Sequence, residues 1–240
     1  GAVIMKLATS GVNLFLAMIL ALAVCGVIGS INGFVVAKIG IPSLITTMAM
    51  VSIVKGSMLM LTGGYPITET FVVLDAIGNG YLMGIPVPVV IFALTVLGAW
   101  VVLSKTRFGR YVYSVGGNAD ASKLNGINVD AYKIKVFIIN AVLAGLAVIV
   151  LGVRIATASR VDGDGYDMDA IASVVIGGTS VAGGSGSALK TVIGVLMMSV
   201  INNSFNLLGV DMYFQYIFKG LIILIAVGFD SYSKKRLATR

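Results

Sequence analysis

The sequence contains no histidine and only one cysteine, Cys25, among its 240 residues. Histidine is the commonest proton shuttle and metal ligand near neutral pH, and a lone cysteine cannot form a disulfide within the chain. The dipeptide Gly-Lys of a phosphate-binding P-loop is also absent, so the chain cannot bind ATP through such a loop. Residues 183–186 (Gly-Gly-Ser-Gly) match the pattern around an intramembrane serine nucleophile, but no histidine is available as its base. These absences exclude such routes to catalysis and leave the sequence with no candidate catalytic residue and no candidate metal site.

Charged residues are also scarce: they make up 11% of the chain, against 58% hydrophobic residues and a mean hydropathy of +1.02. A soluble domain could not cover so much apolar surface with so few polar groups. The net charge of +7 does not indicate nucleic-acid binding, because the basic residues cluster beside long apolar runs instead of along one exposed face. The composition therefore predicts an integral membrane protein.

Long apolar runs are what the sequence has in quantity. A hydrocarbon core of about 30 Å needs about 20 apolar residues in a helix. Six runs approach that length, at residues 12–36, 43–61, 87–103, 134–155, 188–208 and 214–229. A seventh run, residues 170–182, is shorter and contains Gly177 and Gly178, which indicates a tilted or broken helix packed inside the bundle. The continuous runs predict an all-α, polytopic transmembrane helical bundle with about seven membrane segments, and not a barrel, whose strands would alternate every second residue.

The loops between these runs alternate in the sign of their charge. Residues 104–135 hold six basic and two acidic residues, and the tail from residue 230 holds four basic residues and one acidic residue. The loop with Glu69 and Asp75 has no basic residue, and the loop at residues 157–169 is rich in aspartate. Lysine and arginine are retained on the cytoplasmic side, so seven crossings place residues 104–135 and the C-terminus in the cytoplasm. The first run then enters from the outside, which predicts that further spans precede Gly1.

Two lysines and a group of hydroxyl and amide residues lie inside the apolar runs. Lys55 and Lys219 are the bases furthest from a loop end, and each either anchors a helix at the interface or lines a polar cavity. No acidic residue falls inside any run as bounded above, so no proton or sodium relay is evident. The residues assigned to a translocation pathway are Thr46, Thr47, Asn202, Asn203 and Asn206.

The asparagines of the run at residues 188–208 form a stripe, in which Asn202 and Asn206 are four residues apart and share a helix face. Unpaired amides are costly in hydrocarbon, so these side chains must meet another helix or a water-filled path. A neutral amide stripe also suits the passage of uncharged polyhydroxy solutes, because it offers donors and acceptors without a charge. Both interpretations remain open at the level of the sequence.

Two further patterns concern helix packing and helix ends. Gly29 and Gly33 have a GxxxG spacing, which predicts close packing against a neighbouring helix. The aspartates at residues 162–169 are spaced as in a calcium-binding loop, but Tyr166 and Asp167 fall where an EF-hand needs a ligand and its glycine. We therefore expect an exposed acidic loop in which Asp167 or Asp169 caps the next helix.

The most specific local structure lies between Gly116 and Gly126. Asn118 can cap a short helix, Asp120 favours its N-terminus, and Gly126 supplies its stop. Two short amphipathic elements bounded by glycines would form a rigid knob that presents a surface to another protein, whereas the alternative is a solvated loop. The residues assigned to this coupling surface are Gly116, Gly117, Asn118, Asp120, Ala121, Leu124 and Gly126.

Ordered motifs run through nearly the whole chain: residues 106–111 (TRFGRY), 116–118 (GGN), 126–129 (GINV), 165–172 (GYDMDAIA), 177–184 (GGTSVAGG), 202–203 (NN), 206–210 (NLLGV), 215–216 (QY) and Lys219. Together they resemble the permeases of ribose/galactose/xylose-type ATP-binding cassette (ABC) importers. That family usually begins its coupling helix with an acidic residue and then alanine, whereas here Ala119 comes first and the acid is Asp120. The resemblance implies a single permease domain over residues 1–240, an N-terminally incomplete form of the ten-helix type II-like importer permeases, in which residues 104–135 form the cytoplasmic coupling loop.

The resemblance also implies that the chain is a transport subunit and that its partners do the chemistry. Two copies, surrounded by lipid, would form a path across the bacterial inner membrane for a monosaccharide, a ribose-like pentose or a related sugar, delivered by a periplasmic binding protein. Cytoplasmic ATP-binding cassette subunits would hold ATP and Mg and bind the coupling loop, so no cofactor is expected in this chain. The alternative is an ion-coupled secondary transporter of a small neutral solute, for which Lys55 and Lys219 are the titratable residues available away from the ends of the runs.

Overall fold

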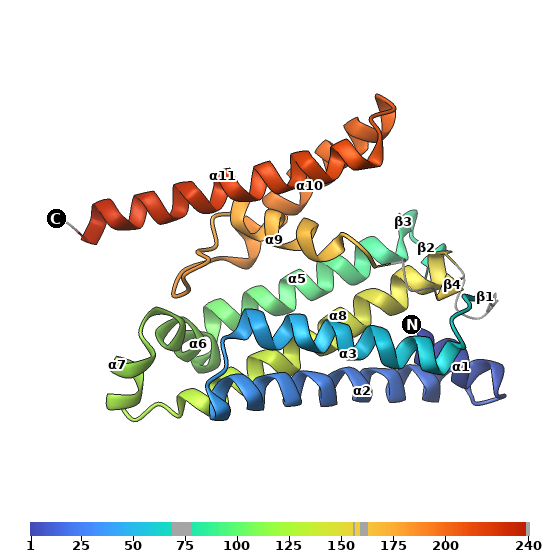
Figure 1. The fold of residues 1–240 in the computed structure, drawn as a ribbon, viewed down its shortest axis with the longest axis horizontal. Coiled ribbons are helices and arrows are strands. Elements are labelled where there is room, and N and C mark those ends of the chain that lie inside the picture. The colour runs from blue at the N-terminus through green and yellow to red at the C-terminus, as the bar shows by residue number, and fades with distance from the viewer. Residues whose placement is uncertain (69–77, 156, 159–162, 239–240) are drawn as a thin grey trace. The chain divides into compact units, whose positions relative to one another are not determined.

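The computed structural model describes residues 1–68, 78–155, 157–158 and 163–238. These residues are mainly helical, because a helix satisfies its backbone N–H and C=O groups within itself when water is absent. The elements in chain order (Figure 1) are α1 (Ala2–Thr9), α2 (Leu14–Phe34), the π-helical turn η1 (Val35–Ile39), α3 (Ser43–Thr62), β1 (Ile67–Thr68), β2 (Tyr81–Leu82), β3 (Ile85–Pro86), α5 (Val87–Lys105), α6 (Arg107–Gly117), α7 (Ala119–Leu124), α8 (Val129–Ile155), β4 (Thr157–Ala158), α9 (Tyr166–Ile176), α10 (Ala188–Leu207) and α11 (Met212–Ala238).

Five helices among the described residues are long and apolar enough to cross a membrane: Leu14–Ile39, Ser43–Thr62, Val87–Lys105, Val129–Gly152 and Ala188–Leu207. They correspond to the first five long runs, so the predicted polytopic helical bundle is confirmed. The sixth run lies in α11, whose apolar part, Met212–Gly228, is shorter.

The run at residues 170–182 has the broken form expected of it. Helix α9 has 11 residues, a length of about 16 Å at 1.5 Å per residue, and the chain is no longer helical after Gly177. Alone it is too short to cross a hydrocarbon core of about 30 Å. The side of the membrane on which each loop lies stays a prediction, and Glu69 and Asp75, which contribute to it, lie outside the described residues.

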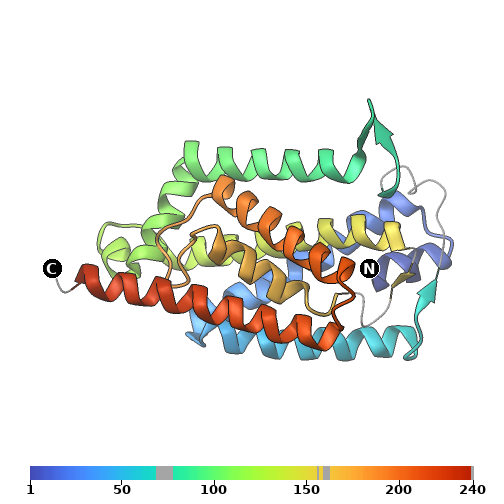
Figure 2. The same cartoon turned by 90° about the horizontal axis from the view of Figure 1, so that it is seen from above.

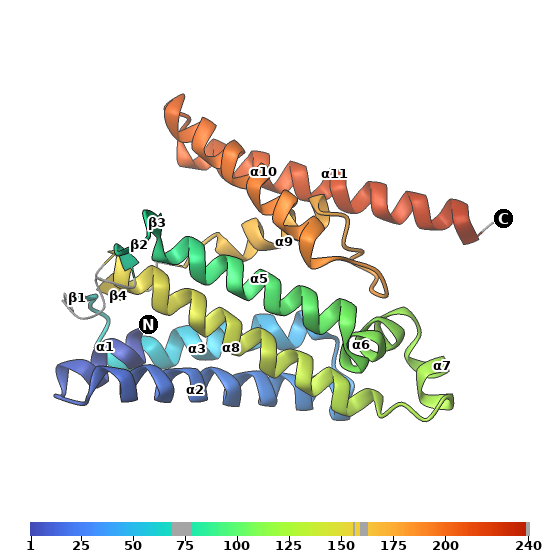
Figure 3. The same ribbon diagram turned by 180° about the vertical axis from the view of Figure 1, so that it is seen from behind.

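The chain forms two compact units, the first of Gly1–Leu94 with Gly126–Asp162 and the second of Thr95–Asn125 with Gly163–Arg240. In the first unit α2 lies along α8, as Figures 1 and 3 show from opposite sides. A Cβ at Gly29 would lie 2.7 Å from both the Phe137 carbonyl oxygen and Ala141 Cβ, and a Cβ at Gly33 would lie 2.7 Å from Ile134 Cα. Only glycine permits this approach, so the packing predicted from the GxxxG spacing is confirmed.

Other contacts of the first unit join its ends. Ile4 of α1, Ala21 of α2 and Ile149 of α8 form one buried apolar cluster. Strand β1 pairs antiparallel with β4, which joins the chain after α3 to the chain after α8. At the opposite end of α8, Lys38 of η1 forms a 3.0 Å ion pair with Asp130. The antiparallel α2–α8 pair is thereby fixed along its whole length.

The second unit is organised around α9, which contacts both α10 and α11 and lies between them in Figure 2. Helices α9 and α10 run antiparallel, and their backbones approach each other closely at two glycines. A Cβ at Gly177 would lie 2.7 Å from the Lys190 carbonyl oxygen, and one at Gly194 would overlap the Ser173 carbonyl oxygen. The two helices therefore form one closely packed hairpin, joined by residues 177–187.

Candidate functional site: the α7 knob and a polar cluster on α9, α10 and α11

The first candidate region is the knob, residues 118–126, which contains α7. Asn118 ends α6 and begins α7 with an extended backbone, and its Oδ1 accepts a 2.9 Å hydrogen bond from the Ala121 N–H. At the other end Asn125 donates from its side chain to the Ala121 carbonyl at 2.9 Å, and Gly126 follows with a φ of +78°. The cap and the stop predicted from the sequence are confirmed, so the knob is an ordered element and not an open loop.

The knob presents a mixed polar and apolar surface. Asp120, Ala121 and Leu124 are exposed, and the Leu124 side chain is 90% exposed. Asp120 stands in the first turn of α7 and Lys123 in its last turn, where each charge is favourable to the helix dipole. An exposed leucine at the end of a short rigid helix suits a protein–protein contact. The assignment of these residues to a docking surface stays a prediction.

Gly116 and Gly117, assigned by the sequence to the same surface, end α6 and lie against the loop between α9 and α10. A Cβ at Gly184 of that loop would lie 2.7 Å from Gly117 Cα, and one at Gly116 would lie 2.9 Å from the Gly184 nitrogen. The two glycines thus face a neighbouring part of their own unit. They lie at the end of α6, directly before the knob begins at Asn118.

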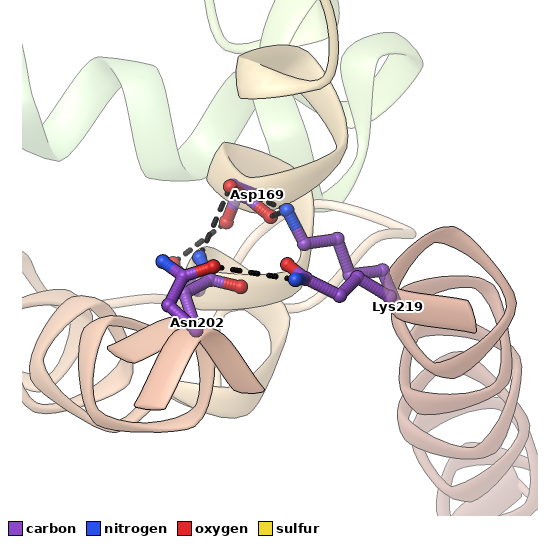
Figure 4. A network of polar contacts seen from close by, with 6 residues as sticks. Asp169, Asn202 and Lys219 are labelled. Carbon is purple, nitrogen blue, oxygen red and sulfur yellow. Dashed lines mark hydrogen bonds and ion pairs between the residues drawn. The ribbon is translucent and has the colours of Figure 1, made fainter. Parts of the chain in front are cut away.

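The second candidate region is a polar cluster formed by Asp169 of α9, Asn202 of α10 and Lys219 of α11 (Figure 4). Lys219 Nζ lies 2.8 Å from Asp169 Oδ1 and donates a 3.0 Å hydrogen bond to Oδ2. Asn202 Nδ2 donates to the same Oδ2 at 3.2 Å. The Lys219 and Asp169 side chains are only 13% and 21% exposed. This largely buried ion pair joins α9 and α11, and the Asn202 amide adds α10 to the cluster.

This cluster corrects two expectations from the sequence. The run at residues 170–182 was bounded so that Asp169 fell outside it, but α9 begins at Tyr166 and Asp169 lies within the helix. Neither Asp167 nor Asp169 caps α9, because the N-cap residue is Gly165, without a side-chain cap. Because α9 starts four residues before the predicted run, Asp169 is part of the helix, and its side chain contacts Asn202 of α10 and Lys219 of α11. The missed signal was Lys219 itself, since a lysine deep in an apolar run needs an opposite charge.

The amide stripe is largely used for contacts between helices. Asn206 Oδ1 accepts a 3.3 Å hydrogen bond from Gln215 Nε2 of α11, and Gln215 also donates to the Val210 carbonyl at 3.0 Å. Asn203 is exposed. The buried Oδ1 of Asn202 has no hydrogen-bond partner among the described residues. Two of the three asparagines therefore bond across helices, and the part that the amide stripe plays in a solute path stays a prediction.

The other residues assigned to the pathway lie in the first unit, on α3. The Thr46 hydroxyl donates to the Pro42 carbonyl at 3.2 Å, and the Thr47 hydroxyl donates to the Ser43 carbonyl at 3.0 Å. Thr46 is buried and Lys55 is exposed. The structure groups Thr46, Thr47 and Lys55 on one helix, in a different compact unit from Asn202 and Lys219. Their role in transport stays a prediction.

Residues 1–227 match the family described as "Branched-chain amino acid transport system / permease component". The chain is 41% identical over 235 residues to the ribose import permease protein of Escherichia coli (strain K12), covering 96% of this chain and 73% of that protein. It is 40% identical over 231 residues to the ribose import permease protein of Bacillus subtilis (strain 168), covering 95% and 72%.

A third relative differs in its sugar. The L-arabinose transport system permease protein of Escherichia coli (strain K12) is 34% identical over 209 residues, which cover 87% of this chain and 64% of that protein. No solved structure shows significant similarity to the chain.

Proposed function

The chain belongs to the permease component family of the branched-chain amino acid transport system type, and on that premise we propose that it is the transmembrane permease subunit of an ABC importer for a monosaccharide. The observation that carries the proposal is the 41% identity to a ribose import permease over 96% of the chain. The multi-pass helical architecture supports it, because five helices of the described residues can cross a membrane. The sugar is a ribose-like pentose or a close relative, since the ribose permeases cover most of the chain and an arabinose permease follows them.

The permease provides the path and its partners provide the energy. We propose that two copies assemble in the bacterial inner membrane, with the C-terminus and the knob in the cytoplasm. A periplasmic binding protein delivers the sugar to the opposite face. An ATP-binding cassette subunit, which holds the ATP and Mg, receives Asp120, Ala121 and Leu124 of the knob in a surface groove. ATP hydrolysis in that subunit then drives the helices between outward and inward access.

The polar cluster supports an ATP-driven mechanism over an ion-coupled one. An ion-coupled carrier needs a titratable group that exchanges its proton or sodium ion with water on both sides. Asp169 instead has Lys219 at 2.8 Å and an amide donor from Asn202, so its charge is already matched within the bundle. The solute path then needs only neutral donors and acceptors, such as the free acceptor of Asn202.

Reconstitution tests the proposal. Proteoliposomes with the complete permease, its ATP-binding cassette subunit and its binding protein are expected to accumulate radiolabelled ribose when ATP is supplied on the cytoplasmic side. Arabinose and xylose are compared in the same assay, and a catalytically inactive ATPase subunit serves as the control. Uptake by the permease alone under a proton or sodium gradient would refute the importer and establish the secondary carrier. ATP-driven uptake of a branched-chain amino acid instead of any sugar would refute the substrate.

A further inference from the structure

The end of α6 and the loop between α9 and α10, residues 177–187, touch backbone to backbone. A Cβ at Gly183 would lie 2.5 Å from the Gly116 carbonyl oxygen, and one at Gly116 would lie 2.9 Å from the Gly184 nitrogen. Gly183 and Gly184 also have φ angles of +90° and +77°, a region that favours glycine. No side chain separates the two segments, so a shift of one by even an ångström must move the other.

Hydrogen bonds hold this contact in place. The Tyr113 hydroxyl of α6 donates to the Gly186 carbonyl at 3.0 Å. Within the loop the Ser180 N–H donates to the Ser185 carbonyl at 3.0 Å, and the Gly183 N–H donates to the Ser180 carbonyl at 3.1 Å. The first bond ties the loop to α6, and the other two fix the shape of the loop. The loop is therefore a folded element and not a slack connection.

The knob is joined just as directly to α6. Ser114 Oγ of α6 and Ser122 Oγ of α7 share a 2.9 Å hydrogen bond, and Ser122 is 2% exposed. A helix of six residues such as α7 is too short to be stable by itself. Its position is therefore set by α6, and a force on the exposed Leu124 reaches α6 through the buried face of α7.

On the membrane side the loop continues into the closely packed α9–α10 hairpin. Gly177 and Gly194 bring the two helix backbones together immediately after the loop, and Asp169 and Asn202 join them again nearer the other end of α9. The hairpin is thus fixed at both ends. The end of the hairpin at Asp169 carries the polar cluster with Lys219.

We infer that residues 177–187 are the positioning element through which a displacement of the knob reaches the membrane: the knob, α6, the loop and the α9–α10 hairpin move as one piece. This inference rests on the proposed function. The contact between Gly116 and residues 183–184 transmits the motion, and Tyr113 keeps the two surfaces in register. Helix α9, which spans only part of the membrane, is the element that the motion shifts relative to α11 and Lys219.

The test compares uptake per ATP hydrolysed in the complete reconstituted importer. Gly116→Ala introduces a Cβ into the contact with Gly184 without a change of backbone region, because Gly116 has an ordinary helical φ. ATP hydrolysis stimulated by the binding protein is expected to persist, while sugar transported per ATP falls by roughly 2- to 30-fold. Gly98→Ala in α5, where no atom of the described part of the chain lies within 4 Å of the new Cβ, is the matched control and is expected to keep the wild-type ratio.

Tyr113→Phe gives an independent reading, since it removes one hydroxyl and adds no volume. It is expected to lower the same ratio, and to do so even if Gly116→Ala prevents assembly of the complex. A wild-type ratio in Tyr113→Phe, or in a correctly assembled Gly116→Ala, would overturn the inference and leave the proposed function standing. Absence of ATP-driven sugar uptake by the wild-type importer would instead overturn the proposed function.

Discussion

The ion pair between Asp169 and Lys219 allows a quantitative test of how the second unit is held together. Among the described residues, replacing Lys219 with Met leaves the Asp169 carboxylate with only the Asn202 amide as a side-chain donor from another helix, and replacing Asp169 with Asn removes the opposite charge at 2.8–3.0 Å from the Lys219 ammonium. The double variant, Asp169→Asn with Lys219→Met, removes both charges. Together with the wild type these three variants form a double-mutant cycle.

The size of the effect follows from burial. Removing one partner of a buried ion pair costs about 3–5 kcal/mol, because the other charge stays desolvated. The two side chains are 13% and 21% exposed. Because water has partial access to them, we expect each single variant to lose about 3 kcal/mol, the lower end of that range. Removing both charges leaves no buried charge without a partner, so the double variant should be no less stable than either single one. The two single losses together are about 6 kcal/mol and the double variant loses at most about 3 kcal/mol, so the coupling free energy should be about 3 kcal/mol or more.

The free energy of unfolding is measured by loss of helical circular dichroism as the permease in mild detergent is titrated with a denaturing detergent. Lys190→Met, which removes the charge of an exposed lysine on α10, serves as the control and should lie within about 0.5 kcal/mol of the wild type. Additivity of the two single changes within about 0.5 kcal/mol would refute the ion pair as a bond between α9 and α11.

Two further outcomes are expected. Gly29→Ala would place a Cβ 2.7 Å from the Phe137 carbonyl oxygen, so α2 and α8 must separate and the free energy of unfolding should fall by about 1–3 kcal/mol. Gly26→Ala, whose Cβ meets only an ordinary 3.6 Å contact, should show no loss in the same detergent titration; equal losses in both variants would contradict the close-packing argument. Asn118→Ala removes the cap that binds the Ala121 N–H, which costs the knob about 1 kcal/mol and should weaken binding of the ATP-binding cassette subunit in a pull-down titration. Asn118→Asp retains the cap and should restore binding, whereas equal binding by Asn118→Ala would show that capping does not matter to docking.

The sequence predicts those parts of the fold whose cause is local. A long apolar run must become a helix in lipid, and the runs at residues 43–61 and 87–103 agree closely with α3 and α5. The Asn118 cap and the stop at Gly126 also depend only on neighbouring residues, and both were predictable. The GxxxG spacing at Gly29 also predicts that another helix packs closely there, although it does not identify that helix.

Features that depend on distant partners could not be predicted in this way. The start of α9 at Tyr166 is a polar first turn, which a hydropathy criterion leaves out, and with it the criterion leaves out Asp169. Asp169, the partner of Lys219, lies 50 residues earlier in the chain. The residues around either one do not indicate that the two side chains meet. The contact of Gly116 with residues 183–184 could not be predicted either, because a glycine in a sequence does not indicate which segment packs against it. Helix α1 was missed because its eight residues are too few to stand out as a membrane run.

The antiparallel pairing of α2 with α8 also constrains how the protein is made. The groove at Gly29 and Gly33 accepts a surface that the ribosome completes only about 100 residues later, roughly 5–20 s at ordinary rates of synthesis. Helices α3 and α5 enter the membrane during that interval and must leave the groove free. A bulky residue at either glycine would therefore be harmful at two stages, first by letting an early helix settle in the wrong place and later by keeping the right one out.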